Sequence, residues 1–148
     1  MSNKIKLVCA VAFVSALAGC ASVPMGDAKQ NAALKTFQAP TDNKSGIYIY
    51  RNEVLGAAVK MDVSVDGAPI GQTVANTYLY KEVAPGKHTI SSTAENTDTL
   101  EIDAKPGTLV YVWQEVKMGM LYARNKLHLE NDADGQKGVA DTNLALTK

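Results

Sequence analysis

Two histidines and a scatter of carboxylates are the side chains of this 148-residue sequence that could bind a metal or move a proton. His88 and His128 lie far apart in the chain, and neither has a second ligand at a spacing typical of a metal site. Asp132, Asp134 and Gly135 suggest the start of a calcium-binding loop, but the remaining ligands and the closing Glu are missing. We therefore predict surface or structural histidines, a polar turn near residue 134, no catalytic residue and no metal site.

Sequence motifs for catalysis and cofactor binding are absent as well. There is no Gly-x-Ser-x-Gly elbow, no His-Glu-x-x-His pair, no phosphate-binding loop and no dinucleotide fingerprint. Fifteen Lys and Arg residues balance fifteen Asp and Glu residues, so no net charge attracts nucleic acid or an anionic membrane. We expect no cofactor and no nucleic-acid partner, and an enzyme is the less favoured class.

The N-terminal segment differs in composition from the rest of the chain. Lys4 and Lys6 precede an apolar run over residues 7–18, which is the order typical of a secretory signal peptide. The run is shorter than the roughly 20 apolar residues that a membrane span needs. The run ends with Leu17 and Ala18, and Gly19 and Cys20 come next. They resemble the lipobox of bacterial lipoproteins in all four positions; an ordinary signal peptide with a chance cysteine is the alternative.

The lipobox resemblance implies that Cys20 takes a diacylglyceryl group and becomes the N-terminus after residues 1–19 are removed. Two or three acyl chains anchor a protein stably, at about 0.8 kcal/mol per buried CH₂. By resemblance to Gram-negative sorting, Ala21 and Ser22 after the cysteine imply the outer membrane. We expect a lipid-anchored protein of the bacterial cell envelope that faces the periplasm. No cysteine follows residue 20, so the domain has no disulfide.

Downstream of Cys20, the sequence predicts a tether, a β domain and a tail. Residues 20–45 contain few large apolar side chains, which indicates a flexible tether, with a marginal short helix over residues 27–37 as an option. Residues 46–130 form the predicted domain. Residues 131–148 form the tail, for which a short helix is again an option.

Within the domain, apolar and polar residues alternate with period two, most clearly over residues 59–66. Asp-Gly and Pro-Gly pairs separate the alternating segments. The segments expected to be strands are 47–51, 59–66, 69–74, 77–83, 87–93, 97–103, 109–114 and 121–130. Residues 109–114 are apolar on both faces and are expected to form a central strand. The pattern predicts an all-β fold, a small antiparallel β-sandwich of about seven or eight strands.

Aromatic side chains form the candidate binding surface. Two tyrosines alternate with Ile47 and Ile49 in one predicted strand, so they would face solvent if the isoleucines are buried. Packing inside the core is the alternative for all of these rings. The apolar segment 117–121 is expected to be a covered edge of the core. The candidate surface consists of Tyr48, Tyr50, Arg51 and Trp113.

The turns of the domain also carry a resemblance. VSVDGAPIG at residues 63–71 and VAPGKHTI at residues 83–90 resemble a PEGA-type repeat, although Val-Ala-Pro-Gly stands where that name would want Pro-Glu-Gly-Ala. Together with IYIYR at 47–51 and GTLVY at 107–111, they resemble an uncharacterised domain of unknown function found on bacterial lipoproteins, over residues 45–130. The resemblance implies a β-sandwich and no known activity.

The sequence therefore predicts a non-catalytic binding or scaffolding module held at a membrane by its lipid anchor. The expected partner is an envelope protein or a cell-wall glycan, engaged through a strand edge or the tyrosine face. One alternative is an enzyme or enzyme accessory acting on envelope material, which would need a cleft with convergent carboxylates or a histidine. Another is a small-ligand carrier with a cavity lined by Val, Ile and Met.

Overall fold

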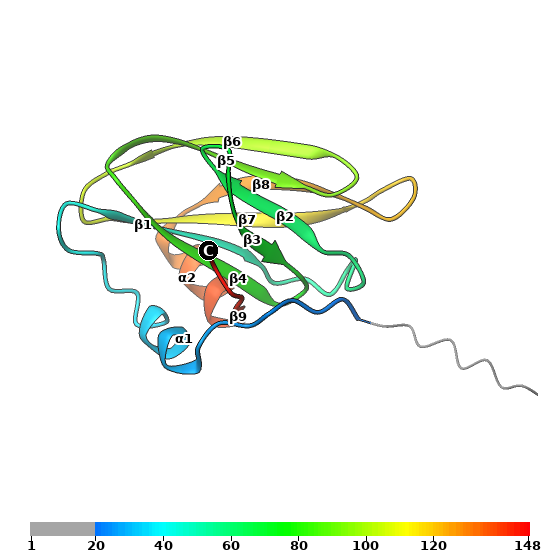
Figure 1. Cartoon of the computed structure of the whole chain (residues 1–148), viewed down its shortest axis with the longest axis horizontal. Coiled ribbons are helices and arrows are strands. Elements are labelled where there is room, and N and C mark those ends of the chain that lie inside the picture. Colours follow the sequence, from blue (N-terminus) through cyan, green and yellow to red (C-terminus); the bar gives the residue numbers. More distant parts are fainter. Residues whose placement is uncertain (1–19) are drawn as a thin grey trace, which may run out of the picture.

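The computed structural model describes residues 20–148 (Figure 1). The predicted signal peptide, with Leu17, Ala18 and Gly19, lies outside the described residues. Two helices are present, α1 (Ala28–Leu34) and α2 (Asp132–Ala140). The strands are β1 (Ser45–Arg51), β2 (Met61–Val65), β3 (Ala68–Thr73), β4 (Thr77–Val83), β5 (Gly86–Thr93), β6 (Thr97–Ala104), β7 (Leu109–Met118), β8 (Ala123–Glu130) and β9 (Asn143–Leu144).

The strands form two sheets packed face to face, as the sequence predicts. One sheet has the order β8-β7-β1-β4-β9, and the other has the order β3-β2-β5-β6. Each of the eight predicted strands is present to within a few residues, and β7 is internal to its sheet, also as predicted. The two-residue turn at Asp66-Gly67 joins β2 to β3, with φ of 51° and 78°, which is why a short polar residue and a glycine stand there. The all-β sandwich is confirmed.

Two pairings depart from an antiparallel arrangement. The first strand, β1, pairs parallel with β7 along one edge and antiparallel with β4 along the other. The short β9 pairs parallel with β4. Both parallel pairs join strands that are distant in the sequence. The local pattern of apolar residues does not specify whether such strands run parallel or antiparallel to each other.

The main core lies between the two sheets. Ile47 and Ile49 of β1 are buried there with Leu79 of β4, opposite Val63 and Ile90 of the other sheet. One polar contact crosses this core, since the Gln114 side chain of β7 accepts a hydrogen bond from Thr73 and donates one to Ser92. Buried polar groups are tolerated where their partners are present.

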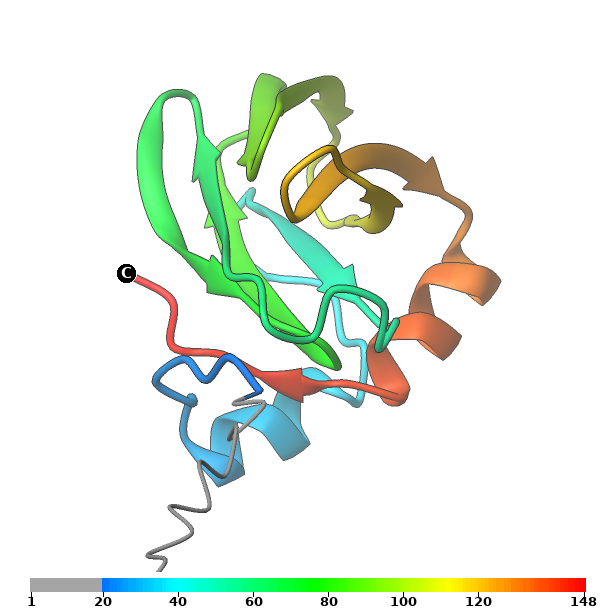
Figure 2. The same ribbon diagram turned by 90° about the vertical axis from the view of Figure 1, so that its right-hand side faces the viewer.

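A second apolar layer covers the outer face of the five-stranded sheet. Both helices lie on that side, away from the other sheet (Figures 1 and 2). Tyrosines of β1, β4 and β7 pack there against three apolar side chains. These are Leu34 of α1, Phe37 just after α1, and Val139 of α2. Asp27 caps α1 by accepting from the backbone of Lys29 and Gln30. The optional helices in the tether and in the tail are thus both present, and both contact the sheet.

The two ends of the described chain are joined to each other. Gly26 N donates to Leu144 O at 2.8 Å, and Leu146 N donates to Pro24 O at 2.8 Å. The Asn31 side chain of α1 accepts from the backbone of Leu144. Residues 24–31 therefore lie along the C-terminal segment. Among residues 20–148, no helix is long and apolar enough to cross a membrane.

Candidate functional site

Cys20 is the first described residue, and it is exposed. The next residue is already held by the domain, because Ala21 N donates to Ala57 O at 3.0 Å. Residue 57 belongs to the loop that joins β1 to β2, residues 52–60. The thiol predicted to be acylated therefore lies at the end of the sandwich that carries this loop.

The candidate binding surface of Tyr48, Tyr50, Arg51 and Trp113 is not an exposed patch. Tyr48 is 1% exposed, Tyr50 is 4% exposed and Arg51 is fully buried. The expectation that the tyrosines face solvent is wrong because α1 and α2 cover the outer face of β1, so this strand is buried on both faces. Trp113 is half-buried and stacks on His128, with ring centroids 5.1 Å apart. The packing alternative is the correct interpretation of the two tyrosines.

The tyrosine layer is held by hydrogen bonds as well as by ring contacts. Tyr48 Oη donates to Leu34 O at 2.7 Å, and Tyr78 Oη donates to Asn31 Oδ1 at 2.9 Å. The Tyr48 and Tyr111 rings stack with centroids 5.3 Å apart. Burial raises the pKa of Tyr78 to about 12, and burial is also the main reason that the pKa of Tyr50 rises to about 12. The hydroxyls of Tyr48 and Tyr78 are the donors that fix α1 to the sheet.

Arg51 organises the loop over residues 52–60. Its guanidinium donates through Nη1 to Val59 O at 2.7 Å, and through Nη2 to Gly56 O at 2.6 Å and Leu55 O at 3.3 Å. Burial lowers the pKa of Arg51, while Glu53 nearby opposes that shift. The arginine predicted to meet a partner instead binds the carbonyls of its own loop from beneath.

Each histidine has a carboxylate partner at a strand end or on a strand surface. His88 Nδ1 lies 2.6 Å from Asp66 Oδ2, and its Nε2 lies 2.7 Å from Ala84 O. Both ring nitrogens of His88 face acceptors, so the protonated ring, which has two donors, fits best. The pKa of His88 is raised, mainly by the hydrogen bond to Asp66. His128 Nε2 lies 2.7 Å from Glu115 Oε2. Within the described residues no group of three metal-ligating side chains gathers.

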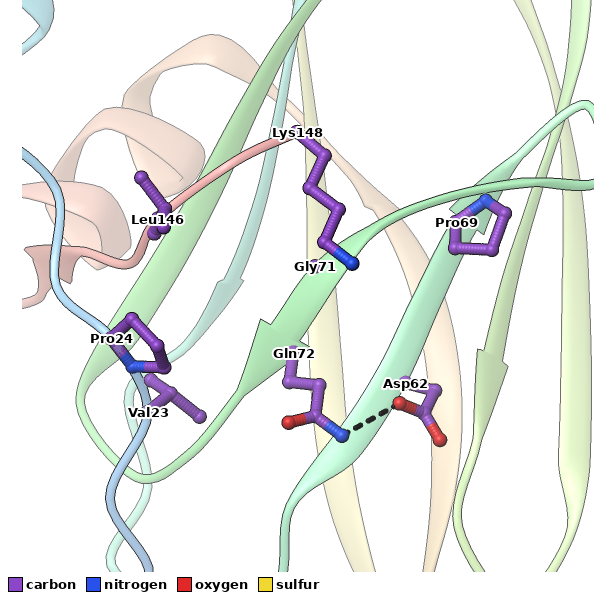
Figure 3. A pocket seen from close by; sticks show the side chains of 8 residues that line it. All are labelled: Val23, Pro24, Asp62, Pro69, Gly71, Gln72, Leu146 and Lys148. Carbon is purple, nitrogen blue, oxygen red and sulfur yellow. Dashed lines mark hydrogen bonds between the residues drawn. The ribbon is translucent and has the colours of Figure 1, made fainter.

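A groove lies where the chain ends meet the edge strand β3 (Figure 3). It has a volume of about 370 Å³ and is open to solvent. Pro24 and Leu146 stand on one side and Pro69 on the other, while Lys148 reaches across the top. Asp62 accepts a hydrogen bond from Gln72 at 2.8 Å on its floor. This arrangement could accommodate an extended segment with apolar and polar groups.

The hairpin between β7 and β8 presents an exposed apolar surface, which contradicts the expectation for this segment. Residues 117–121 were expected to be a covered edge, but Met118, Met120 and Leu121 are 79%, 91% and 87% exposed. The carboxylate of Glu95 accepts from the backbone N–H groups of Met120, Leu121 and Tyr122 at 2.8 to 3.1 Å. The loop is thus held by its backbone while its side chains point out. A run of apolar residues at a hairpin turn, where polar residues are usual, was the available signal.

These features define the class of protein, a two-sheet β-sandwich with an exposed cysteine at one end. The chain belongs to the DUF2846 family of proteins of unknown function, whose model matches residues 41–125. An uncharacterized protein of Haemophilus influenzae is 32% identical over 133 residues, which cover 88% of this chain and 79% of that protein. No solved structure matches significantly. The resemblance of this segment to a domain of unknown function is confirmed.

Proposed function

We propose that this protein is a lipoprotein of the bacterial cell envelope, acylated at Cys20, whose sandwich is a non-catalytic binding module. The observation that carries the proposal is the Leu-Ala-Gly-Cys sequence ending at Cys20, whose thiol is exposed at the boundary of the folded domain. Such a thiol is open to the enzymes that attach lipid and cleave the preceding bond. Ala21 and Ser22 after the cysteine fit sorting to the outer membrane, with the domain in the periplasm.

The titratable side chains favour binding over catalysis. His88 holds the β2–β3 turn to the β4–β5 turn through Asp66 and Ala84. Glu95 is occupied by backbone N–H groups, which lower its pKa. Groups engaged in this way are poorly placed to bind a substrate or exchange a proton with it. The resemblance to PEGA-type repeats, which implies no known activity, agrees with this proposal.

The groove beside β3 is the site that we propose for a partner, now that the tyrosine face is known to be covered. Its mixture of Pro24, Pro69 and Leu146 with Asp62 and Lys148 suits an extended segment of another envelope protein. The β3 strand lies at the edge of its sheet. A cell-wall glycan is the competing ligand.

The anchor is tested by the intact mass of the protein purified from the membranes of a Gram-negative host that expresses the full chain. We expect a chain that begins at Cys20 and carries the mass of a diacylglyceryl group and an amide-linked acyl chain. A Cys20→Ala chain should keep residues 1–19 and gain no lipid. Recovery of the parent chain with an unmodified Cys20 would contradict the proposal.

The binding role is tested by crosslinking in the same cells. A photo-crosslinking amino acid replaces Pro69 in the groove, or Lys105 in the loop between β6 and β7 as a matched exposed control outside the groove. We expect a protein adduct from position 69 that is lost when Leu146→Asp is added or when Cys20→Ala removes the anchor. Glycan captured at position 69, or equal capture at both positions, would argue against a protein partner in the groove.

A further inference from the structure

Exposed apolar side chains concentrate at the end of the sandwich that carries Cys20. Of the nine large hydrophobic side chains that are exposed within residues 20–148, five lie in two loops, and a sixth is the last residue of the strand that leads into one of them. One loop joins β1 to β2 and the other joins β7 to β8. Both loops project from the end of the molecule that faces the viewer in Figure 2. Cys20 lies at this end, because Ala21 N donates to Ala57 O in the first loop. We call these six the apolar end: Val54, Leu55, Met118, Met120, Leu121 and Tyr122.

The two loops lie close together because the first is fastened to the two strands that carry the second. Glu53 Oε2 accepts a hydrogen bond from Val116 N at 2.8 Å, which joins the first loop to β7. A Cβ added at Gly56 would stand 3.1 Å from Val116 Cγ1 and 3.5 Å from Ala123 Cβ, so the loop backbone lies directly against the β7–β8 hairpin. Exposed apolar groups on adjoining, fixed loops mark an interaction surface.

Several backbone groups of the apolar end already have hydrogen-bond partners, which an apolar environment requires. Glu95 takes the N–H groups of Met120, Leu121 and Tyr122, and Arg51 takes the carbonyls of Leu55 and Gly56. The loops can therefore enter a medium of low polarity without leaving these groups unpaired.

The position of Cys20 indicates which medium this is. Cys20 directly precedes Ala21, whose N–H binds Ala57 O in the first of the two loops. Acyl chains on Cys20 would enter the bilayer beside the apolar end. Exposed Lys60 and Arg124 flank the loops, where they can meet lipid phosphates, and Tyr122 is of a type enriched at membrane interfaces.

We propose that the apolar end is a second membrane contact, which inserts its side chains into the lipid interface and holds the sandwich against the bilayer. The inference rests on the proposed acylation of Cys20, because the lipid anchor is what brings this end to the membrane. In this arrangement the far end of the sandwich, with Lys105, points into the periplasm. The groove beside β3 stays open at the side.

The test uses the lipidated protein, expressed as the full chain, purified and reconstituted into vesicles of phosphatidylethanolamine and phosphatidylglycerol. Once Cys20 is acylated and residues 1–19 are removed, no free thiol remains, so one new cysteine can be labelled selectively. Met120→Cys carries a polarity-sensitive fluorophore at the apolar end. Lys105→Cys carries it at the opposite end as the control. We expect the emission at position 120 alone to shift to shorter wavelength and to be quenched by lipids spin-labelled on the acyl chain.

Two further variants separate insertion from a general change in the fold. Leu121→Asp in the Met120→Cys background should abolish the quenching while the unfolding transition stays unchanged, because residue 121 is exposed. Glu95→Ala frees the three N–H groups of the loop and should weaken the quenching, whereas Glu101→Ala, which removes an exposed carboxylate on β6, should not.

The outcomes distinguish this inference from the proposed function. A lipidated mass with no quenching at position 120 would overturn the membrane contact and leave the anchor intact. A blue shift that grows with protein concentration without vesicles would assign the apolar end to contact between copies of the chain, and would also overturn it. An unmodified Cys20 would overturn the anchor and the inference together.

Discussion

Arg51 shows how one buried charge can organise an entire loop. The side chain is fully buried, and it contacts three backbone carbonyls between residues 55 and 59 instead of a carboxylate. Removing a guanidinium from such a place has opposing effects, because the desolvation cost of the charge disappears along with its hydrogen bonds. The net change in stability is set by the carbonyls that lose their partner, since hydrogen bonds to charged groups contribute about 1.5–3 kcal/mol each.

We therefore expect Arg51→Met to lower the free energy of unfolding by about 1–3 kcal/mol, as measured by urea denaturation. Hydrogen exchange should rise over residues 52–60 and stay unchanged in β5 and β6. Arg124→Met, at an exposed position of β8, is the control and should stay within about 0.5 kcal/mol of the parent. Unaltered exchange over residues 52–60 would show that the loop does not depend on Arg51.

The Asp66–His88 pair predicts a pH dependence. The hydrogen bond between them raises the pKa of His88 and lowers the pKa of Asp66. The contribution of His88 is complete below its unfolded pKa of about 6.5 and is lost as pH rises through the higher folded value. The contribution of Asp66 is complete above about pH 3.9 and is lost as pH falls through its lower folded value. The pair should stabilise the fold most between these limits.

The expected result is that His88→Gln destabilises the protein more at about pH 5.5 than at about pH 8.5, as measured by urea unfolding. Partial solvent exposure of Asp66 keeps the effect small. His128→Gln serves as the control, because it leaves the Asp66–His88 pair intact. This variant should keep the pH dependence of stability that we assign to the pair. An equal loss for His88→Gln at both pH values would contradict the assignment.

At the scale of elements, α2 depends on two glycines for its approach to the sheet. Gly135 packs against the Tyr111 ring and Gly138 against the Tyr50 ring, and a Cβ added at either position would collide with that ring. Glycine costs about 1 kcal/mol relative to alanine within a helix, so on an exposed helix its replacement would stabilise. Here the close packing against the tyrosine rings makes the same replacement destabilising.

Gly138→Ala should therefore lower the free energy of unfolding by about 1–3 kcal/mol, because the helix must move away from Tyr50. Lys137→Ala, on the exposed side of the same helix, should change the free energy by less than about 0.5 kcal/mol. Chemical denaturation of the two variants provides the comparison. Stabilisation by Gly138→Ala would mean that the contact with Tyr50 is looser than the structure describes.

At the scale of the whole molecule, the C-terminal segment joins α1 to the sheet. Leu144 is buried, its backbone N–H binds Asn31, and its carbonyl accepts from Gly26. Ala145 N donates to Tyr78 O on β4. The two ends of the described chain therefore fold as one unit with the five-stranded sheet.

Leu144→Ala should cost about 2–4 kcal/mol through the cavity that it leaves, and should raise hydrogen exchange in α1 as well as in β9. Leu146→Ala is the matched control, since that side chain is about half exposed and its truncation should cost less than about 1 kcal/mol. Loss of protection in β9 alone would show that the two ends are not coupled.

The amino-acid sequence determined the local features of this protein. Period-two alternation identifies strands such as residues 59–66, a run that is apolar on both faces identifies the central strand at 109–114, and the Asp66-Gly67 pair marks the tight turn. Strand pleating and positive φ act on neighbouring residues, which is why these signals are local. The same pattern places Ile47 and Ile49 on one face of β1 and Tyr48 and Tyr50 on the other. The lipobox resemblance, from which we propose acylation at Cys20, is equally local.

Only the tertiary structure decided which faces are covered. Alternation divides residues between the two faces of a strand, but burial of a face depends on where distant segments dock. Residues 28–34 and 132–140 cover the tyrosines of β1, while nothing in the described chain covers residues 118–122. The pairing of β1 with β7, the loop contacts of Arg51 and the position of Cys20 beside the apolar end likewise come from contacts between residues far apart in the sequence.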